Sequence, residues 1–246
     1  MIRKSLFQIR RESAILAEGN GVDMVRTLHC GPYTVDLFTA AGSQTVVYAV
    51  MDQAEAQAVW PMLKEPRPAL AAVSGVDWNR ELSPWSATKV FRGSENFGGE
   101  GQAFLNMLTG QIVPLVETQL GFSPVSRAVA GYSLAGLFAL WAVFQTDAFD
   151  RVASVSGSLW FDGFMDYMRS SAPPNGLRQI YLSLGDREKN ARNQRMAAVE
   201  DCTRRTAELL RERNLPVMFE MNPGGHFQDI PGRIVRGIDR LMESAH

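Results

Sequence analysis

Ser133 stands at the junction of a predicted strand, residues 125–130, and a predicted buried helix, residues 134–144. Gly131 and Ala135 lie two positions before and two positions after it, and small residues there let the chain turn sharply from strand to helix. Glycine is usual at the second place, so Ala135 is a mild departure. The pattern is typical of a nucleophile elbow, which presents a serine hydroxyl for attack on a carbonyl carbon. The alternative is a serine that only caps the helix.

His226 is the predicted general base for this serine, because a serine hydroxyl is a weak nucleophile without one. The sequence holds three histidines. His246 is the last residue, where we expect fraying, and His29 lies in an early predicted hairpin, ahead of Ser133. His226 follows the last predicted strand, residues 217–221, and functional residues of open α/β sheets gather at the carboxyl ends of the strands. The alternative is a loop histidine with no role.

Two carboxylates compete for the third place in a serine, acid, histidine order. Asp186 and Glu188 both follow Gly185 at the end of a predicted strand, residues 179–184. One of them has to accept the Nδ1 proton of His226 and stabilise the imidazolium. Glu188 is favoured because its side chain reaches further and its offset from the glycine is common for the acid. Asp186 stays open as the second candidate.

Backbone N–H groups near Ser133 are predicted to hold the oxyanion that forms during attack. The Leu134 N–H lies at the start of the helix, where it faces developing negative charge. A second donor is expected after the predicted strand at residues 69–74, from the N–H of Gly75 or Val76. The alternative for Gly75 is an ordinary turn glycine.

The segment 75–99 is long and irregular, and such loops within compact domains are usually functional or disordered. It carries Trp78, Arg80 and Trp85. An arginine pairs with carboxylates and phenolates, and tryptophan stacks on rings, so these residues are candidates for binding an anionic or aromatic acyl group. Equally, the tryptophans could pack the loop against the domain while Arg80 forms a surface ion pair.

Apolar periodicity predicts the elements that position these residues. Early strands read as an antiparallel hairpin, and from residue 75 strands and helices alternate, which implies parallel strands with crossover helices. We therefore expect one α/β domain over residues 1–246, with a mostly parallel sheet, antiparallel N-terminal strands and helices on both faces. The remaining predicted strands are residues 22–30, 33–39, 45–51 and 152–156, and the remaining helices are residues 102–120, 192–214 and 229–242.

Composition excludes several classes of protein. The chain has 246 residues and a formal net charge of -1, so it lacks the basic field of a nucleic-acid-binding protein. Two cysteines and three histidines leave little for a disulfide framework or a metal centre. We see no secretory signal and no apolar run long enough to span a membrane, so a cytoplasmic location is expected. The expected partner is a small-molecule ester, and the expected state is a monomer or homodimer.

The sequence resembles the esterase D-like α/β-hydrolases, and within them the enterochelin (trilactone siderophore) esterases. The resemblance extends from about residue 46 to 227. It is carried by four segments, residues 131–136 (GYSLAG), 154–160 (SVSGSLW), 183–188 (SLGDRE) and 224–226 (GGH).

This resemblance implies an α/β-hydrolase fold and hydrolysis of carboxylic esters without a metal or organic cofactor. It also implies that the segment ending in Trp160 lines the pocket beside the nucleophile. The substrate stays open, and a catecholate trilactone ester is one candidate. An acyltransferase or a hydrolase of small acyl thioesters is the alternative on the same fold. A non-catalytic binding protein is a third possibility.

Overall fold

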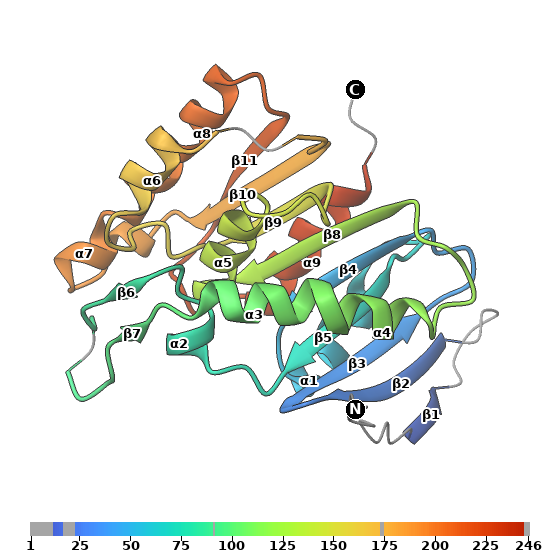
Figure 1. Ribbon diagram of the computed structural model, residues 1–246. Helices are drawn as coiled ribbons and strands as arrows, with labels where there is room; N and C mark the ends of the chain where they lie inside the picture. Colours follow the sequence, from blue (N-terminus) through green and yellow to red (C-terminus); the bar gives the residue numbers. More distant parts are fainter. Residues whose placement is uncertain (1–11, 17–22, 91, 173–174, 244–246) are drawn as a thin grey trace.

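A single nine-stranded sheet organises the computed structural model, which describes residues 12–16, 23–90, 92–172 and 175–243 (Figure 1). The strand order is β1-β2-β3-β5-β4-β8-β9-β10-β11. The strands are β1 (Glu12–Leu16), β2 (Asp23–Cys30), β3 (Tyr33–Thr39), β4 (Thr45–Val50), β5 (Ala69–Ser74), β8 (Ser126–Tyr132), β9 (Arg151–Val155), β10 (Gln179–Gly185) and β11 (Val217–Asn222).

The sheet is antiparallel at its N-terminal end and parallel elsewhere. Strands β1, β2 and β3 pair antiparallel, as do β3 and β5, whereas the pairs from β5 to β11 are parallel. Strands β2 and β3 can be antiparallel neighbours because only Gly31 and Pro32 separate them, and Gly31 takes the positive φ of +61° that such a tight turn favours. The predicted mixed sheet is therefore confirmed.

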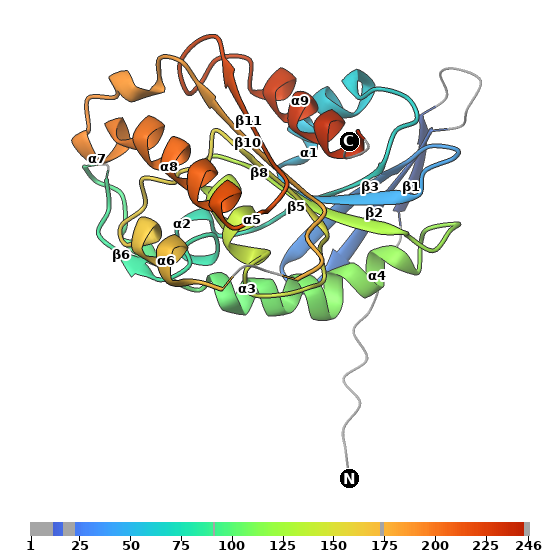
Figure 2. The ribbon, with the colours of Figure 1, turned by 90° about the horizontal axis from the view of Figure 1, so that it is seen from above.

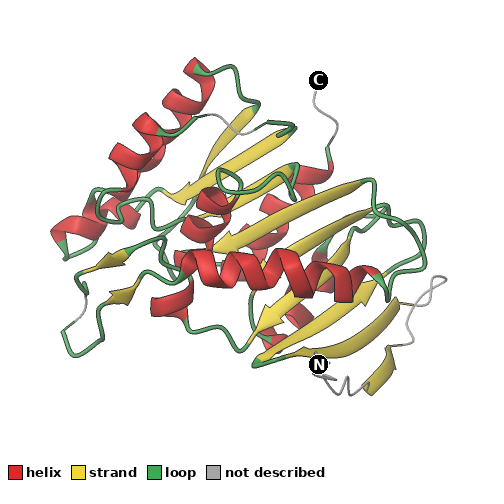
Figure 3. Ribbon diagram, viewed as in Figure 1, coloured by secondary structure: helices red, strands yellow, loops and turns green. Residues whose placement is uncertain are grey.

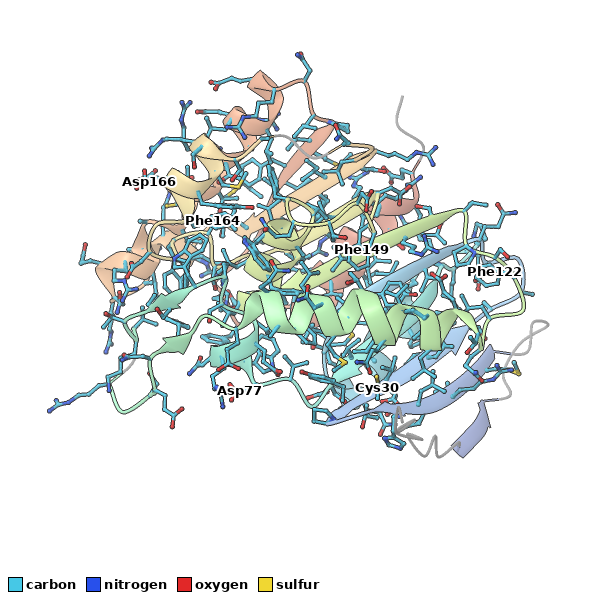
Figure 4. The ribbon with its side chains drawn as sticks, in the orientation of Figure 1. Cys30, Asp77, Phe122, Phe149, Phe164 and Asp166 are labelled. Carbon is cyan, nitrogen blue, oxygen red and sulfur yellow. The ribbon has the colours of Figure 1, made fainter. Side chains whose placement is uncertain are left out.

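Helices cover both faces of the sheet and enclose two apolar cores (Figures 2 and 3). On one face lie α1 (Gln53–Val59) and α9 (Ile230–Met242), and on the other lie α3 (Gly101–Met107), α4 (Val113–Glu117), α5 (Leu134–Ala142), α6 (Phe164–Ser170) and α8 (Val199–Glu212). Helix α5 is buried over its whole length, which explains its apolar sequence. Helix α6 is two-sided, with buried Phe164 toward the interior and exposed Asp166 on the outer side (Figure 4).

Several short elements differ from the sequence prediction. Strand β1 and helices α1 and α6 were not predicted, and each has only five to seven residues. The predicted helix at residues 192–214 is two helices, α7 (Gln194–Ala197) and α8, joined at Ala198. The predicted helix at 102–120 contains a π-helical turn at Leu108–Ile112, between α3 and α4. Apolar periodicity continues through both interruptions, so it does not reveal them.

The segment predicted as irregular, residues 75–99, forms a short helix and a small hairpin. These are α2 (Trp78–Glu81) and the paired strands β6 (Ser86–Ala87) and β7 (Phe97–Gly98). They lie with α7 on the side toward which the parallel strands point (Figure 1). Among the residues that the structure describes, no helix combines the length and apolar character needed to cross a membrane.

Candidate active site

Ser133 sits at the strained turn between β8 and α5. Its φ of 58° and ψ of -119° lie in a region that L-residues rarely adopt. A Cβ on Gly131 would lie 2.3 Å from the backbone of Ala135, so only glycine fits there. The Ser133 side chain makes no capping hydrogen bond to the helix, although Ser133 is its N-cap residue. The hydroxyl is therefore not engaged in helix capping.

A chain of hydrogen bonds joins Ser133 to a histidine and a carboxylate. The Ser133 Oγ lies 3.0 Å from His226 Nε2, and His226 Nδ1 lies 2.7 Å from Glu188 Oε2. The three residues follow β8, β11 and β10, whose carboxyl ends meet at one edge of the sheet. With its proton on Nδ1, His226 donates to Glu188 and accepts from the Ser133 hydroxyl, which is the geometry of a general base.

Glu188 is buried, and both of its carboxylate oxygens have hydrogen-bond donors. Its Oε1 accepts from the Gly185 N–H at 2.7 Å and from Arg233 Nη1 at 3.0 Å, while Oε2 faces His226. Burial alone would raise the pKa of the Glu188 carboxyl, but the hydrogen bonds and charge of His226, together with the Gly185 N–H, outweigh it and hold that pKa below its ordinary value. Glu188 is thus kept ionised beside the imidazole.

Asp186, the second candidate for the acid, has a different partner. Its Oδ1 accepts from the Gly224 N–H at 2.8 Å, and its side chain is 57% exposed. This contact ties the end of β10 to the loop that carries His226. Of the two carboxylates that the sequence left open, the structure brings Glu188 to the imidazole.

A cavity of about 260 Å³ opens directly over Ser133. Trp78 and Trp160, two residues predicted to bind substrate, line it. Ser158 also lines it, with its Oγ 3.4 Å from the Ser133 Oγ. Most of the remaining lining is apolar, and it includes Val90, Leu134, Phe97, Met196, Val199 and Phe227.

Arg80 and Trp85 do not join this cavity. The Arg80 guanidinium forms an ion pair with Glu100 at 2.6 Å and bonds it through both Nε and Nη2. The Trp85 Nε1 donates to the Asp162 carbonyl at 2.8 Å, and its ring packs against Phe161. Both side chains hold the segment after β5 in place.

The predicted oxyanion donors follow β8 and β5, at the same edge of the sheet. Leu134 lines the cavity, and its N–H is the first of α5, where no acceptor exists within the helix. Gly75 follows β5 with a φ of +81°, and a Cβ there would lie 2.6 Å from the Pro32 carbonyl oxygen. The described residues that line the cavity do not include Gly75 or Val76, but they include Asn79 from the same segment.

Arg233 and Tyr132 support the site and were not identified from the sequence. Arg233 is fully buried, and besides Glu188 it donates to the carbonyls of Pro223 and Gly225, in the loop before His226. The Tyr132 hydroxyl donates to the His226 carbonyl. Arg233 could have been identified from the sequence because it is a charged residue on the apolar face of α9. A charge buried there needs a buried partner.

Elsewhere in the described part of the chain, no three His, Cys, Asp or Glu side chains gather closely enough to hold a metal ion. The prediction that the protein needs no metal or organic cofactor stays a prediction.

Residues 54–229 match the family described as "Putative esterase". The chain belongs to this family. The predicted family is therefore confirmed, and its description agrees with the predicted class of enzyme, a hydrolase acting on ester bonds. Among curated proteins, "Uncharacterized protein YbbA" of Bacillus subtilis (strain 168) is 31% identical over 111 residues. That match spans 44% of each protein.

Solved structures share the fold of this family member. The siderophore hydrolase EstA from Aspergillus nidulans superposes with a TM-score of 0.66 at 21% identity, covering 94% of this chain and 93% of EstA. The enterobactin and salmochelin hydrolase IroE superposes with a TM-score of 0.64 at 16% identity, covering 97% and 96%. These similarities confirm the predicted α/β-hydrolase fold.

Proposed function

We propose that the protein is a serine carboxylic-ester hydrolase in which Ser133, His226 and Glu188 form a catalytic triad. The observation that carries the proposal is the continuous hydrogen-bonded chain from Ser133 Oγ through His226 to Glu188, three residues that all line the cavity. Family membership supports the same class of reaction.

In the proposed first half-reaction, the Ser133 Oγ attacks the ester carbonyl carbon while its proton moves to His226 Nε2. Glu188 stabilises the imidazolium through the Nδ1–H bond. The Leu134 N–H and a second N–H, from Gly75 or Val76, hold the oxyanion. His226 then gives the proton to the departing alcohol, which leaves an acyl group on Ser133.

In the second half-reaction, water replaces the alcohol. His226 Nε2 takes a proton from the water as its oxygen attacks the acyl carbon, and returns the proton to Ser133 Oγ as the carboxylic acid departs. The enzyme is regenerated, and no group beyond the ester and water is consumed. The same acyl-enzyme would serve an acyltransferase or a small acyl-thioester hydrolase if another acceptor or thioester entered the cavity.

The test is turnover of 4-nitrophenyl butyrate together with labelling by a fluorophosphonate. Ser133→Ala is expected to abolish both, whereas Ser170→Ala, on the exposed end of α6, is expected to retain both. Intact-mass analysis locates the phosphonate adduct. Unchanged turnover in Ser133→Ala contradicts the proposal, and failure of the wild-type protein to label favours the binding-protein alternative. Added alcohol acceptors distinguish a hydrolase from an acyltransferase, since only the latter yields mainly a new ester.

A catecholate trilactone is the finer candidate for the ester. EstA and IroE are named for siderophore hydrolysis, and Trp78 and Trp160 in the cavity could stack on a catechol ring. Arg80, predicted from the sequence to meet a phenolate, is instead paired with Glu100. Hydrolysis of ferric and iron-free catecholate trilactones, beside simple short-chain esters, tests this candidate directly.

A further inference from the structure

We infer that the cavity over Ser133 accepts esters whose buried group is apolar and uncharged, and rejects esters that carry an anionic group there. The inference rests on the proposed function, since it concerns the selectivity of the same site. Three observations support it. The walls are mostly apolar, the neighbouring arginines are paired with carboxylates, and two aromatic side chains are exposed beside the cavity.

The walls of the cavity are mostly apolar, although Asn79, Ser94, Ser156 and Ser158 also line it. Phe97 comes from β7, Met196 from α7 and Val199 from the start of α8. Trp160 adds an indole face beside them, and its ring centroid lies 6.4 Å from that of Phe97. A substrate group seated here exchanges water for carbon and aromatic surface, which favours apolar groups.

The lining carries two acidic side chains. Glu188 and Glu95 line the cavity, and no lysine or arginine does so among the described residues. Glu188 is the buried partner of His226, so it is negatively charged in the resting site. Arg233, 3.0 Å from Glu188 Oε1, balances that charge, so an anionic substrate group chiefly loses its hydration among described walls that offer it no cation.

The arginines beside these walls are each paired with a carboxylate: Arg233 with Glu188, Arg195 with Asp162 and Arg80 with Glu100. The Arg195 guanidinium lies 5.9 Å from the Trp160 ring centroid, but it is paired with Asp162 through two hydrogen bonds, of 3.0 and 2.6 Å. Arg195 also donates to the carbonyls of Thr88 and Lys89. Arg80 is held by Glu100 in the same way. Recruiting either arginine to a substrate anion would require breaking an existing charge-assisted pair.

Two aromatic residues are exposed where the cavity meets solvent. Trp78 on α2 is 43% exposed and Phe227 is 81% exposed, although both line the cavity. The Phe227 ring stands edge-on to the His226 ring, with centroids 5.0 Å apart. Both rings are therefore open to contact with a bound ester. These rings can cover the part of an apolar ester that extends beyond the 260 Å³ cavity.

The experiment compares three 4-nitrophenyl esters on the full-length protein: the butyrate, the hemisuccinate and the methyl succinate. The hemisuccinate replaces the terminal methyl of the butyrate with a carboxylate, and the methyl succinate restores neutrality at a larger size. We expect kcat/KM for the butyrate to exceed that for the hemisuccinate about 100-fold, with the methyl succinate close to the butyrate. Equal values for butyrate and hemisuccinate, or a preference for the hemisuccinate, overturn the inference.

A matched pair of variants tests the cause. Met196→Lys places a cation in the wall and is expected to narrow the butyrate-to-hemisuccinate ratio about tenfold, whereas Met196→Gln, of similar length and no charge, leaves the ratio within about threefold. Equal ratios in the two variants overturn the electrostatic explanation.

Fluorophosphonate labelling separates this inference from the proposed function. Absence of labelling and of turnover for all three esters contradicts the proposed function. Labelling of Ser133 with no turnover of the butyrate, or with equal turnover of neutral and anionic esters, leaves the nucleophile in place and overturns the inference alone.

Discussion

Glu188→Gln is the most informative single substitution, because the structure dictates how the new amide must lie. Oε1 of Glu188 accepts two hydrogen bonds, from the Gly185 N–H at 2.7 Å and from Arg233 at 3.0 Å. Both partners are donors, so the amide oxygen of a glutamine has to occupy that position. The amide NH2 then takes the place of Oε2, 2.7 Å from His226 Nδ1.

That arrangement gives His226 the wrong tautomer. An NH2 group can only donate, so Nδ1 must accept and the ring proton moves to Nε2, which then faces the Ser133 Oγ at 3.0 Å. A protonated Nε2 cannot take the serine proton, and the carboxylate charge that stabilises the imidazolium is also lost. We therefore expect kcat to fall by about 10³- to 10⁴-fold, the scale seen when a triad acid is replaced by its amide.

The assay is steady-state hydrolysis of 4-nitrophenyl butyrate, with Asp186→Asn as the matched control. Asp186 accepts from the Gly224 N–H, which an asparagine oxygen also does, and its ion pair with Arg187 is long, at 3.9 Å. The kcat of that variant should therefore stay within about threefold of wild type. Circular dichroism checks that both variants are folded. A Glu188→Gln enzyme with more than a tenth of wild-type kcat, or equal losses in the two variants, would refute this account of the acid.

Three further predictions concern stability. Arg233→Met removes one partner of a fully buried ion pair and should lower the free energy of unfolding by about 3–5 kcal/mol in urea titrations; a loss under about 1 kcal/mol contradicts the role assigned to the pair. Gly131→Ala should lower the free energy of unfolding by about 1–3 kcal/mol because its Cβ would meet the Ala135 backbone. In the control Gly110→Ala, the Cβ meets nothing within 4 Å, so stability should be unchanged or higher. A lower melting temperature for Gly110→Ala than for Gly131→Ala would show the contact to be unimportant. Because the pKa of Glu188 is lowered by folding, its ionised form stabilises the protein above the ordinary value of 4.5, and this contribution disappears as pH falls through the lower folded pKa. The stability difference between wild type and Glu188→Gln should therefore shrink below about pH 4.5, and a difference independent of pH would count against it.

The sequence by itself determined the features that depend on neighbouring residues. The turn at Ser133 could be recognised because its geometry requires small residues at Gly131 and Ala135, two places along the same chain. His226 could be selected because it follows a strand, and parallel strands deliver their carboxyl ends to one edge. Local spacing and strand direction were sufficient for these predictions.

Only the tertiary structure decided between residues of the same chemical type at similar positions in the sequence. Asp186 and Glu188 lie two residues apart after β10. Arg233 on α9 bonds Glu188, whereas the Gly224 N–H bonds Asp186, and these contacts decide which carboxylate faces His226. The position of the Arg80 side chain likewise depends on its ion pair with Glu100, which follows the β6–β7 hairpin. A charged side chain goes where a partner or water balances its desolvation, and that balance depends on residues distant in the sequence. The apolar cavity has the same origin, because its walls come from separate elements that meet only in the folded protein.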